Sequence, residues 1–271
     1  MSLRVHHLNC ATLRPPIEGV TENGRMVCHC LLVETVAGLV LVDTGFGTGD
    51  VARPEETLHP LVRQNLAPDL LRQETAFAQV EALGFATSDV RHIVLTHLDC
   101  DHAGGLRDFP EAAVHVSAAG FAAMQQPPTP EVAARYVAKQ WEHGPNWVVE
   151  PADGDEWFGL TDVRPLTGLD ELLLVPLDGH MNGHNGVAVP LEDGRWLLHA
   201  GDAAFHRGRI APEDAPCPLL TEPMERAGAA DEKAYEATIE RLAALHRDHA
   251  DRVEIVFAHD TRQYDRLVAT R

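Results

Sequence analysis

The sequence is short of basic side chains and has no long hydrophobic run. Its 271 residues contain 22 Lys and Arg against 41 Asp and Glu, which gives a formal net charge of −19. This charge repels phosphate backbones and anionic lipid headgroups, and no dense cluster of Lys and Arg offsets it. No stretch approaches the roughly 18 uncharged apolar residues that would cross a bilayer. We therefore expect a small-molecule substrate, with no nucleic acid and no membrane as partner.

The sequence also lacks an apolar leader and paired cysteines. Residues 1–20 contain two histidines and two prolines where a secretory signal needs an uninterrupted apolar stretch, which predicts a cytoplasmic protein. The five cysteines are an odd number without a C-x-x-C pair, so neither a disulfide framework nor a zinc knuckle is indicated. Cys28 and Cys30 alternate along a strand-like segment, and we interpret them as buried structural thiols rather than metal ligands.

Strand-like and helix-like segments mix throughout the chain, which predicts an α/β fold. A helix expected at 74–83 leads into a β-branched strand at 89–96, the outline of an α/β unit. A second helix is expected at 231–247. The other predicted strands cover residues 3–8, 26–35, 39–42, 113–116, 172–175, 186–189, 196–198 and 253–257. Neither an internal repeat nor a linker is evident, so residues 1–271 are predicted to form a single domain.

A proline-punctuated segment at about 121–158 stands apart, because it holds three of the four tryptophans. We interpret it as an insertion that forms a lid or pocket wall, with Trp141 and Trp147 as candidate substrate-binding residues. The alternative is that these aromatic side chains fill the core of a helical excursion. Residues 211–223 contain four prolines, which is the composition of a loop.

The motif that carries chemistry follows the strand at 89–96. His97, Asp99, Asp101 and His102 are four potential metal ligands within six residues. Because side chains alternate along an extended chain, the first three project to one side, and the glycines after His102 permit a turn. Two carboxylates and two imidazoles at a strand exit are expensive to bury unless a cation neutralises them. The motif therefore predicts a metal centre.

The segment 97–102 resembles the His-x-His-x-Asp-His signature of the metallo-β-lactamase-fold superfamily of hydrolases. Asp43-Thr44-Gly45 is similar to the strand-end Asp-Thr-Gly of that superfamily, and residues 178–184 resemble the Pro-Gly-His-x-x-Gly-His segment of its lactonase and glyoxalase II branches. Residues 199–202 resemble its Gly-Asp segment and residues 257–260 its closing Gly-His-Asp. The resemblance, over roughly residues 30 to 260, implies a four-layer αββα sandwich with the site at one edge.

The resemblance also implies a cofactor of two divalent metal ions, Zn, Fe or Mn. One ion would be held by His97, Asp99 and His180, and the other by Asp101, His102 and His259, with Asp202 bridging the two. Asp43 would orient a metal ligand from behind, and His184 is a candidate for a similar supporting role. Asp101 and Asp202 are the residues for which we expect catalytic roles.

Two positions depart from the family pattern. Asp99 replaces the second histidine of the signature, and a carboxylate there adds negative charge and favours Fe or Mn relative to Zn without excluding Zn. Phe205 stands three residues after Asp202, where the lactone-cleaving members carry a tyrosine that polarises the carbonyl. Phenylalanine cannot donate a hydrogen bond, so the adjacent His206 is the candidate for that role. We expect both Phe205 and His206 to contact substrate.

Together these features predict a metal-dependent hydrolase, dinuclear, that cleaves a small ester, lactone or thioester by attack of a metal-bound hydroxide. Two alternatives remain open at this stage. One is a mono-iron dioxygenase on the same fold, similar to the persulfide-oxidising branch, and the other is a non-catalytic relative that binds a ligand in the tryptophan-bearing segment.

Overall fold

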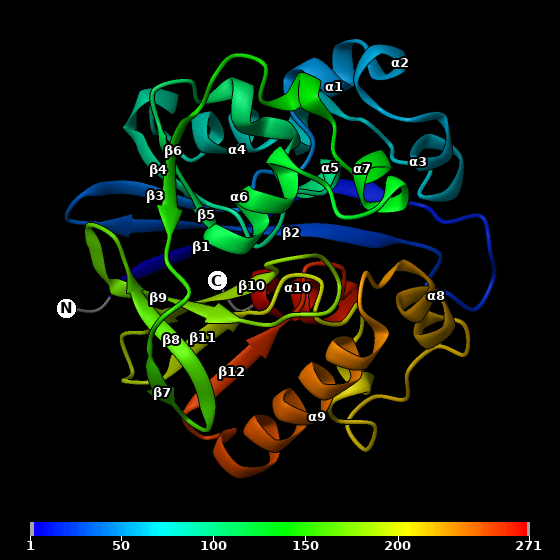
Figure 1. Ribbon diagram of the computed structural model, residues 1–271, viewed down its shortest axis with the longest axis vertical. Coiled ribbons are helices and arrows are strands. Elements are labelled where there is room, and N and C mark those ends of the chain that lie inside the picture. Colours follow the sequence, from blue (N-terminus) through cyan, green and yellow to red (C-terminus); the bar gives the residue numbers. More distant parts are fainter. Residues whose placement is uncertain (1–2, 270–271) are drawn as a thin grey trace.

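The described residues, 3–269 of a computed structural model, form two six-stranded sheets that pack face to face (Figure 1). The strand order is β1-β2-β3-β4-β5-β6 in the first sheet and β12-β11-β10-β9-β8-β7 in the second. Helices α1 to α7 cover the outer side of the first sheet, and α8 and α9 cover the second (Figure 1). This is the four-layer αββα sandwich that the sequence predicts.

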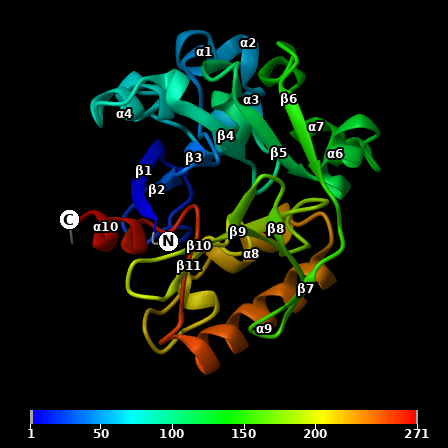
Figure 2. The same cartoon turned by 90° about the vertical axis from the view of Figure 1, so that its left-hand side faces the viewer.

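Each sheet is formed by consecutive strands, because all strands of the first sheet precede those of the second in the sequence. The first sheet contains β1 (Arg4–Leu13), β2 (Met26–Thr35), β3 (Gly38–Val42), β4 (Val90–Val94), β5 (Ala113–Ser117) and β6 (Asn146–Glu150). The second contains β7 (Asp155–Trp157), β8 (Leu160–Leu166), β9 (Leu169–Pro176), β10 (Asn185–Pro190), β11 (Trp196–His199) and β12 (Val253–Val256). Figure 2 shows the two halves of the chain one above the other, with α10 returning to the side of β1 and β2.

The helices are short, apart from one. They are α1 (Thr48–Ala52), α2 (Pro54–Thr57), α3 (Pro60–Asn65), α4 (Ala76–Ala82), α5 (Cys100–Ala103), α6 (Ala118–Gln125), α7 (Pro130–Arg135), α8 (Thr221–Gly228), α9 (Glu232–His249) and α10 (Thr261–Ala269). Short 3-10 turns are η1 (Arg72–Glu74), η2 (Thr87–Asp89), η3 (Gly104–Asp108), η4 (Ala138–Gln140) and η5 (Arg207–Arg209). Within residues 3–269, no helix combines the length and apolarity needed to span a membrane.

Capping side chains set where the two predicted helices begin. Thr75 precedes α4 and its hydroxyl accepts from the amide of Ala78 at 3.2 Å, and Asp231 precedes α9 and accepts from the amide of Ala234 at 3.0 Å. The strand predicted at 3–8 is longer than expected, since β1 continues to Leu13. The strand predicted at 89–96 is shorter, because the chain leaves the sheet after β4 to enter the metal-ligand loop.

The segment 121–158 is more than the insertion predicted from its composition. It contributes β6 and β7, which are the edge strands of the two sheets, whereas the end of α6, the helix α7 and the turn η4, with their flanking turns, lie outside the sheets. The sequence pattern did not predict β6, because this five-residue strand lies among prolines and tryptophans and only its Glu150 is fully buried. Trp147 and Trp141 pack against the hydrophobic cluster on the outer face of the first sheet, which is the core-filling alternative.

Strand alternation divides the core into three layers. On β2, Leu31 and Val33 face the second sheet, whereas Cys30 and Leu32 face the helices that cover the first sheet. On the far side, the ring of Tyr235 in α9 is fully buried against the second sheet. Each fully buried aliphatic or aromatic side chain contributes on the order of 1.5–3 kcal/mol, so these layers hold the strand ends in place.

A buried carboxylate in α1 anchors the start of the ligand loop. Asp50 is 2% exposed and accepts from the amide of Gly47 at 2.9 Å. The amide nitrogen of Gln140 lies 3.4 Å from the Asp50 carboxylate and donates to the carbonyl of Cys100 at 3.0 Å. Burial raises the pKa of the Asp50 carboxyl to about 6, with partial compensation by the Gly47 amide.

This raised pKa predicts how stability depends on pH. The folded chain binds the Asp50 proton more tightly than the unfolded chain, so the free energy of unfolding falls as pH rises from about 4 to about 6. Asp50→Asn removes the titrating group. Between pH 4.5 and pH 7.5 the free energy of unfolding of the wild type should therefore fall by about 2 kcal/mol more than that of Asp50→Asn. Urea denaturation of the metal-free proteins at both pH values measures the difference. Asp153→Asn, at an exposed carboxylate, is the control, and an unchanged difference for Asp50→Asn would contradict the prediction.

Candidate metal centre

Loops at the carboxyl ends of parallel strands in both sheets meet at one edge of the sandwich. β3 runs parallel to β4 in the first sheet, and β11 runs parallel to β12 in the second. Since parallel strands end at the same edge, the side chains that follow them lie close together. The structure brings together the seven predicted ligands His97, Asp99, Asp101, His102, His180, Asp202 and His259.

Hydrogen bonds from behind orient three of the four imidazoles. Nδ1 of His102 donates to the Asp43 carboxylate at 2.8 Å, and Nδ1 of His259 donates to the carbonyl of Val27 at 2.8 Å. Nδ1 of His97 lies 3.0 Å from the hydroxyl of Thr96. With Nδ1 engaged in this way, Nε2 of each ring is directed into the centre, which is the usual arrangement of metal-binding histidines.

The Asp202 carboxylate lies between all four imidazoles. Its Oδ2 is 3.2 Å from Nε2 of His259, 3.4 Å from Nε2 of His180 and 3.8 Å from Nε2 of His97. Its Oδ1 is 3.3 Å from Nε2 of His102. Among these seven side chains, Asp202 is therefore the one that contacts an imidazole through each of its two oxygens, and it lies between the His97 and His180 rings and the His102 and His259 rings.

Within the described residues, the site contains buried polar atoms without a hydrogen-bond partner. Nε2 of His102 and Oδ1 of Asp202 are buried and find no hydrogen-bond partner among residues 3–269. Two sets of ligand atoms each lie within 4.8 Å of one another: those of His97, His180 and Asp202, and those of His102, Asp202 and His259. Buried polar atoms without partners are costly, and divalent ions bound by these donors would satisfy them.

The charges of the site are strongly coupled. Burial alone would raise the pKa of the Asp202 carboxyl, but the imidazoles of His259 and His102 hold it well below its usual value. Burial would lower the pKa of His102, yet Asp202, Asp43 and Asp101 raise it well above its usual value. A cation must therefore displace imidazole protons, so metal affinity is expected to increase as pH rises.

Asp43 is held in a backbone conformation that few residues adopt. Its φ is +57°, in the left-handed region, where aspartate and asparagine are tolerated best among residues with a side chain. The carboxylate accepts from the amide of Thr96 at 2.8 Å and from its hydroxyl at 2.7 Å, in addition to His102. Strain of this kind persists where surrounding contacts over-determine it, and here those contacts fix the orientation of the His102 ring.

His184 supports Asp202 from the protein side. Its Nδ1 donates to the carbonyl of Leu177 at 2.8 Å, and its Nε2 accepts from the amide of Asp202 at 2.9 Å. Burial holds the pKa of His184 well below its usual value, so the ring stays neutral and can accept. Gly201 has a φ of +53°, and a Cβ there would lie 2.8 Å from Nε2 of His184, so only glycine fits beside this ring.

Comparison with known proteins identifies the family. A sequence model of the metallo-beta-lactamase superfamily matches residues 23–259. The chain belongs to this superfamily. The protein named "Probable metallo-hydrolase Rv2300c" of Mycobacterium tuberculosis is 43% identical over 263 residues, which cover 97% of this chain and 82% of that protein. The N-acyl homoserine lactonase AiiB of Agrobacterium fabrum is 27% identical over 211 residues, which cover 74% of this chain and 64% of that protein.

Solved structures of other proteins share the fold. A mutant of AiiA from B. thuringiensis, crystallised with N-decanoyl-L-homoserine at the active site, superposes with a TM-score of 0.73 at 19% identity, covering 98% of this chain and 97% of that chain. AidC, described as a dizinc quorum-quenching lactonase, gives a TM-score of 0.64 at 15% identity, covering 96% and 88%. The relatives support a metal-dependent hydrolase at this general level.

Asp99, which replaces the second histidine of the signature, has a partner that the sequence analysis missed. Arg135, the last residue of α7, donates from Nε to Oδ1 of Asp99 at 2.9 Å and from Nη2 to Oδ2. Oδ2 of Asp99 also lies 3.1 Å from Nε2 of His97 and 3.2 Å from Nε2 of His180. Burial would raise the pKa of the Asp99 carboxyl, but the guanidinium lowers it well below its usual value. The pair has no net charge, like the neutral histidine that the superfamily signature places at this position.

Arg135 is itself fixed by main-chain contacts. Its Nη1 donates to the carbonyl of Gly228 at 2.6 Å and to that of His180 at 3.2 Å, and Nη2 lies 2.8 Å from Nε2 of His180. Burial together with the guanidinium lowers the pKa of His180 to about 4, so its ring is neutral. Arg135 lies 36 residues after Asp99, and the only sequence signal for it is that an extra carboxylate in a buried site needs a cation.

The predicted substrate-contacting residues fall in different places. Phe205 lines a cavity of about 180 Å³ together with the metal ligands, and its ring packs edge-on against His180 and His259. His206 is buried beside it, but its Nδ1 accepts from the amide of Gly208 at 3.0 Å and so caps η5. Trp141 and Trp147 lie in the outer core cluster described above rather than on this cavity.

The contacts of Asp43 predict a measurable loss of metal affinity when its charge is removed. Asp43→Asn keeps a side chain that tolerates the positive φ but cannot accept from Thr96 and His102 as the carboxylate does. We expect zinc affinity to fall about 10- to 100-fold, measured by competition with a chromogenic chelator. The matched control is Asp108→Asn, at a carboxylate that accepts two hydrogen bonds from Thr48. Equal affinities for Asp43→Asn and the wild type would contradict the orienting role.

The ion pair of Arg135 predicts a metal-dependent change in stability. Arg135→Met leaves Asp99 buried without its guanidinium partner, which should destabilise the metal-free protein by about 3 kcal/mol. A bound cation would replace that partner, so the loss should shrink in the zinc-loaded protein, and metal should bind more tightly than in the wild type. Urea denaturation with and without zinc tests this. Arg209→Met, which breaks a buried pair with Glu225, should lower the free energy of unfolding equally with and without zinc. An equal loss with and without zinc for Arg135→Met would exclude a link between this ion pair and metal binding.

Proposed function

We propose that the chain is a dinuclear metallohydrolase that cleaves a small ester, lactone or thioester. The observation that carries the proposal is the position of Asp202, whose two oxygens face four inward-directed imidazoles. Such a carboxylate can bridge two cations held by residues on either side of it. The unpartnered atoms of His102 and Asp202 support an ion on the His102 side, because one cation there would satisfy both. The separate group of His97, His180 and Asp202 donor atoms supports an ion on the other side.

The residues on the two sides would hold the two ions separately. His97, Asp99 and His180 surround one position, and Asp101, His102 and His259 surround the other. Two divalent cations bound here would supply a hydroxide at neutral pH and a Lewis acid for the carbonyl oxygen. Asp43 and His184 keep the ligands in place throughout, since neither needs to move or change protonation.

Asp101 is placed to handle a proton. Its carboxylate lines the cavity, and its Oδ2 is 3.6 Å from Nε2 of His259 and 3.9 Å from Nε2 of His102. Asp101 is 7% exposed, which is more than His102 or His259, the other two predicted ligands of the same ion. A carboxylate in this position can accept a proton from the attacking water and pass it toward the leaving oxygen or sulfur.

The cavity beside the ligands suggests a substrate with an apolar group. Its polar wall is made by Asp99, Asp101, Arg135, His180, Asp202 and His259. Its apolar wall is made by Leu13, Met26, Leu66, Phe205 and Met224. A carbonyl directed at the metal positions would leave an alkyl or acyl substituent against the apolar wall, which favours a small ester, lactone or thioester over a highly charged phosphodiester.

Phe205 bears on the choice among these substrates. Its ring packs against His180 and His259, and its amide donates to the Glu225 carboxylate at 2.6 Å, so the backbone here is fixed. No hydroxyl is available at this position to polarise a carbonyl. The Arg135 guanidinium lines the cavity as a positive charge, and metal ions held by the ligands would supply the Lewis acid for the carbonyl oxygen.

The test combines metal content with a substrate panel. The chain is stripped with a chelator, reloaded with Zn, Mn or Fe(II), and assayed on esters, lactones and thioesters of matched acyl length by the acid that hydrolysis releases. Near two ions per chain by elemental mass spectrometry, with turnover that depends on them, is the expected result. One iron per chain and oxygen uptake with a thiol substrate would replace this proposal with the dioxygenase alternative.

Asp202→Ala is the decisive variant. It removes the bridging oxygens, so turnover should fall below detection and metal content should fall to about one ion per chain or less. Asp248→Asn, at an exposed carboxylate on the last turn of α9, should leave both unchanged. An active Asp202→Ala protein that retains two ions would overturn the assignment.

A further inference from the structure

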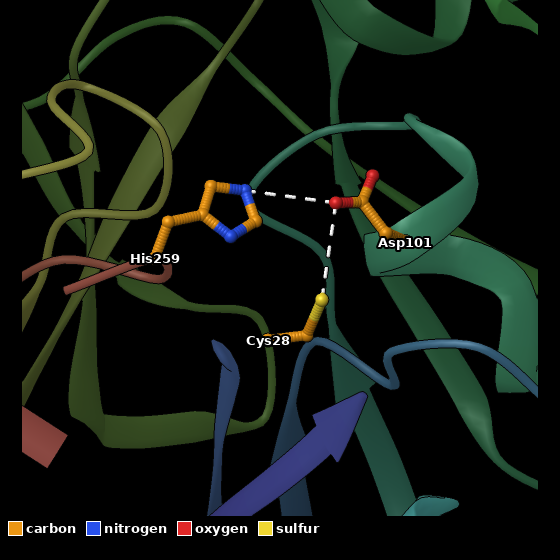
Figure 3. Close-up of side chains that lie close together, drawn as sticks. All are labelled: Cys28, Asp101 and His259. Carbon is orange, nitrogen blue, oxygen red and sulfur yellow. Dashed lines mark hydrogen bonds and ion pairs between the residues drawn. The ribbon is translucent and has the colours of Figure 1, made fainter. Parts of the chain in front are cut away.

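Cys28 lies beside the second set of proposed metal ligands. Its side chain projects from β2 toward the Asp101 carboxylate and the His259 ring, and the three side chains face one another across a small gap (Figure 3). The Sγ atom is 3.9 Å from Oδ2 of Asp101, which is itself 3.6 Å from Nε2 of His259. One donor atom from each of the three lies within 4.8 Å of the others.

The fold explains why this thiol is exceptional among the cysteines. Cys28 and Cys30 share the outer face of β2, where Cys30 is enclosed by aliphatic side chains of the first sheet and its covering helices. Cys28 sits one pleat closer to the start of the strand, at the edge where the ligand loop crosses over the sheet. It is 2% exposed and meets a carboxylate and an imidazole instead of a purely aliphatic surface.

The spacing of the donor atoms around Asp101 is close to that of ligands on one ion. Donors bound to a single tetrahedral zinc at about 2.0–2.3 Å lie roughly 3.3–3.8 Å apart. Oδ2 of Asp101 is 3.9 Å from the Cys28 sulfur, 3.6 Å from Nε2 of His259 and 3.9 Å from Nε2 of His102. The donors of Cys28, Asp101 and His259 therefore need only small side-chain movements to reach one ion. Nε2 of His102 is buried and finds no hydrogen-bond partner in the described part of the chain, and its donor group shares His259 with that of Cys28.

We propose that Cys28 is a thiolate ligand of the ion held by Asp101, His102 and His259. The proposal rests on the proposed metal centre and extends its ligand set by a residue that the sequence analysis interprets as structural. Binding would exchange the thiol S–H bond for a sulfur–metal bond, and the proton would leave to solvent. A thiolate is a soft donor, so this position should favour zinc over manganese more strongly than the position that contains Asp99.

The competing role for Cys28 is that of a hydrogen-bond donor to the Asp101 carboxylate. The Sγ to Oδ2 distance of 3.9 Å also permits a weak S–H hydrogen bond, in which sulfur never contacts the ion. The two roles differ in a spectroscopic property, because only a sulfur–metal bond produces thiolate-to-metal charge transfer.

The experiment titrates cobalt(II) into the chelator-stripped full-length chain and records the absorption spectrum. Visible ligand-field bands report cobalt bound by any donors, and a near-ultraviolet charge-transfer band reports a cobalt–thiolate bond. The wild type should show both. Cys28→Ser and Cys28→Ala should lose the charge-transfer band and keep visible bands, whereas Cys30→Ser and Cys217→Ser should keep both. An independent readout is the number of protons released on zinc loading, which should be one lower per chain for Cys28→Ala than for the wild type.

The outcomes separate this proposal from the proposed function. Visible bands without charge transfer in the wild type, or charge transfer that persists in both Cys28 variants, would overturn the thiolate ligand and leave the metal centre intact. Absence of any bound cobalt or zinc would overturn both. If both Cys28 variants fail to fold, the variants Cys10→Ser, Cys30→Ser, Cys100→Ser and Cys217→Ser still decide, because a charge-transfer band that persists in all four leaves Cys28 as its source, and loss of the band in one of them overturns the proposal.

Discussion

The structure depends on one electrostatic constraint, which is the burial of several carboxylates at the edge where the two sheets meet. Asp43, Asp101 and Asp202 are each at least nine-tenths buried, and Asp99 is nearly so. Burial raises the free energy of a carboxylate unless positive charge lies close by. The chain supplies that charge with imidazoles around Asp202 and with Arg135 beside Asp99. Metal ions would supply it at the centre, where the paired donor atoms are left without partners.

The residues around the buried carboxylates fix the positions of the candidate ligands. Asp43 accepts a strained backbone because Thr96 and His102 over-determine its position, and His102 thereby presents Nε2 to Asp202. His184 does the same for the Asp202 main chain, with Gly201 giving it room. Asp43, Thr96, His184 and Gly201 are not among the proposed metal ligands. They restrict the ligands to one arrangement before a cation arrives, which lowers the entropic cost of binding one.

The sequence could predict the ligands because their signals are local. His97 to His102 lie in one strand exit with fixed alternation, and the resemblance to a known signature extends this to His180, Asp202 and His259. Arg135 could not be predicted, because its pairing with Asp99 depends on how α7 packs over the ligand loop. Strand alternation correctly places Cys28 on a buried face, but for a related reason it does not say that a carboxylate and an imidazole lie beside it. Likewise, the tryptophans of the 121–158 segment concealed the edge strands β6 and β7.

The contiguity of the two sheets has a mechanical consequence. The strands of the first sheet all precede β7 and those of the second all follow β6, so the two sheets come from two successive lengths of chain, with only α10 returning from the second length to β1 and β2. His97 and Asp101 come from the first length, whereas His180, Asp202 and His259 come from the second. Any cation that binds between them acts as a cross-link across the interface of the two halves. The affinity for that cation and the free energy that holds the two halves together are then linked, so separation of the halves should weaken metal binding and loss of the metal should weaken the interface.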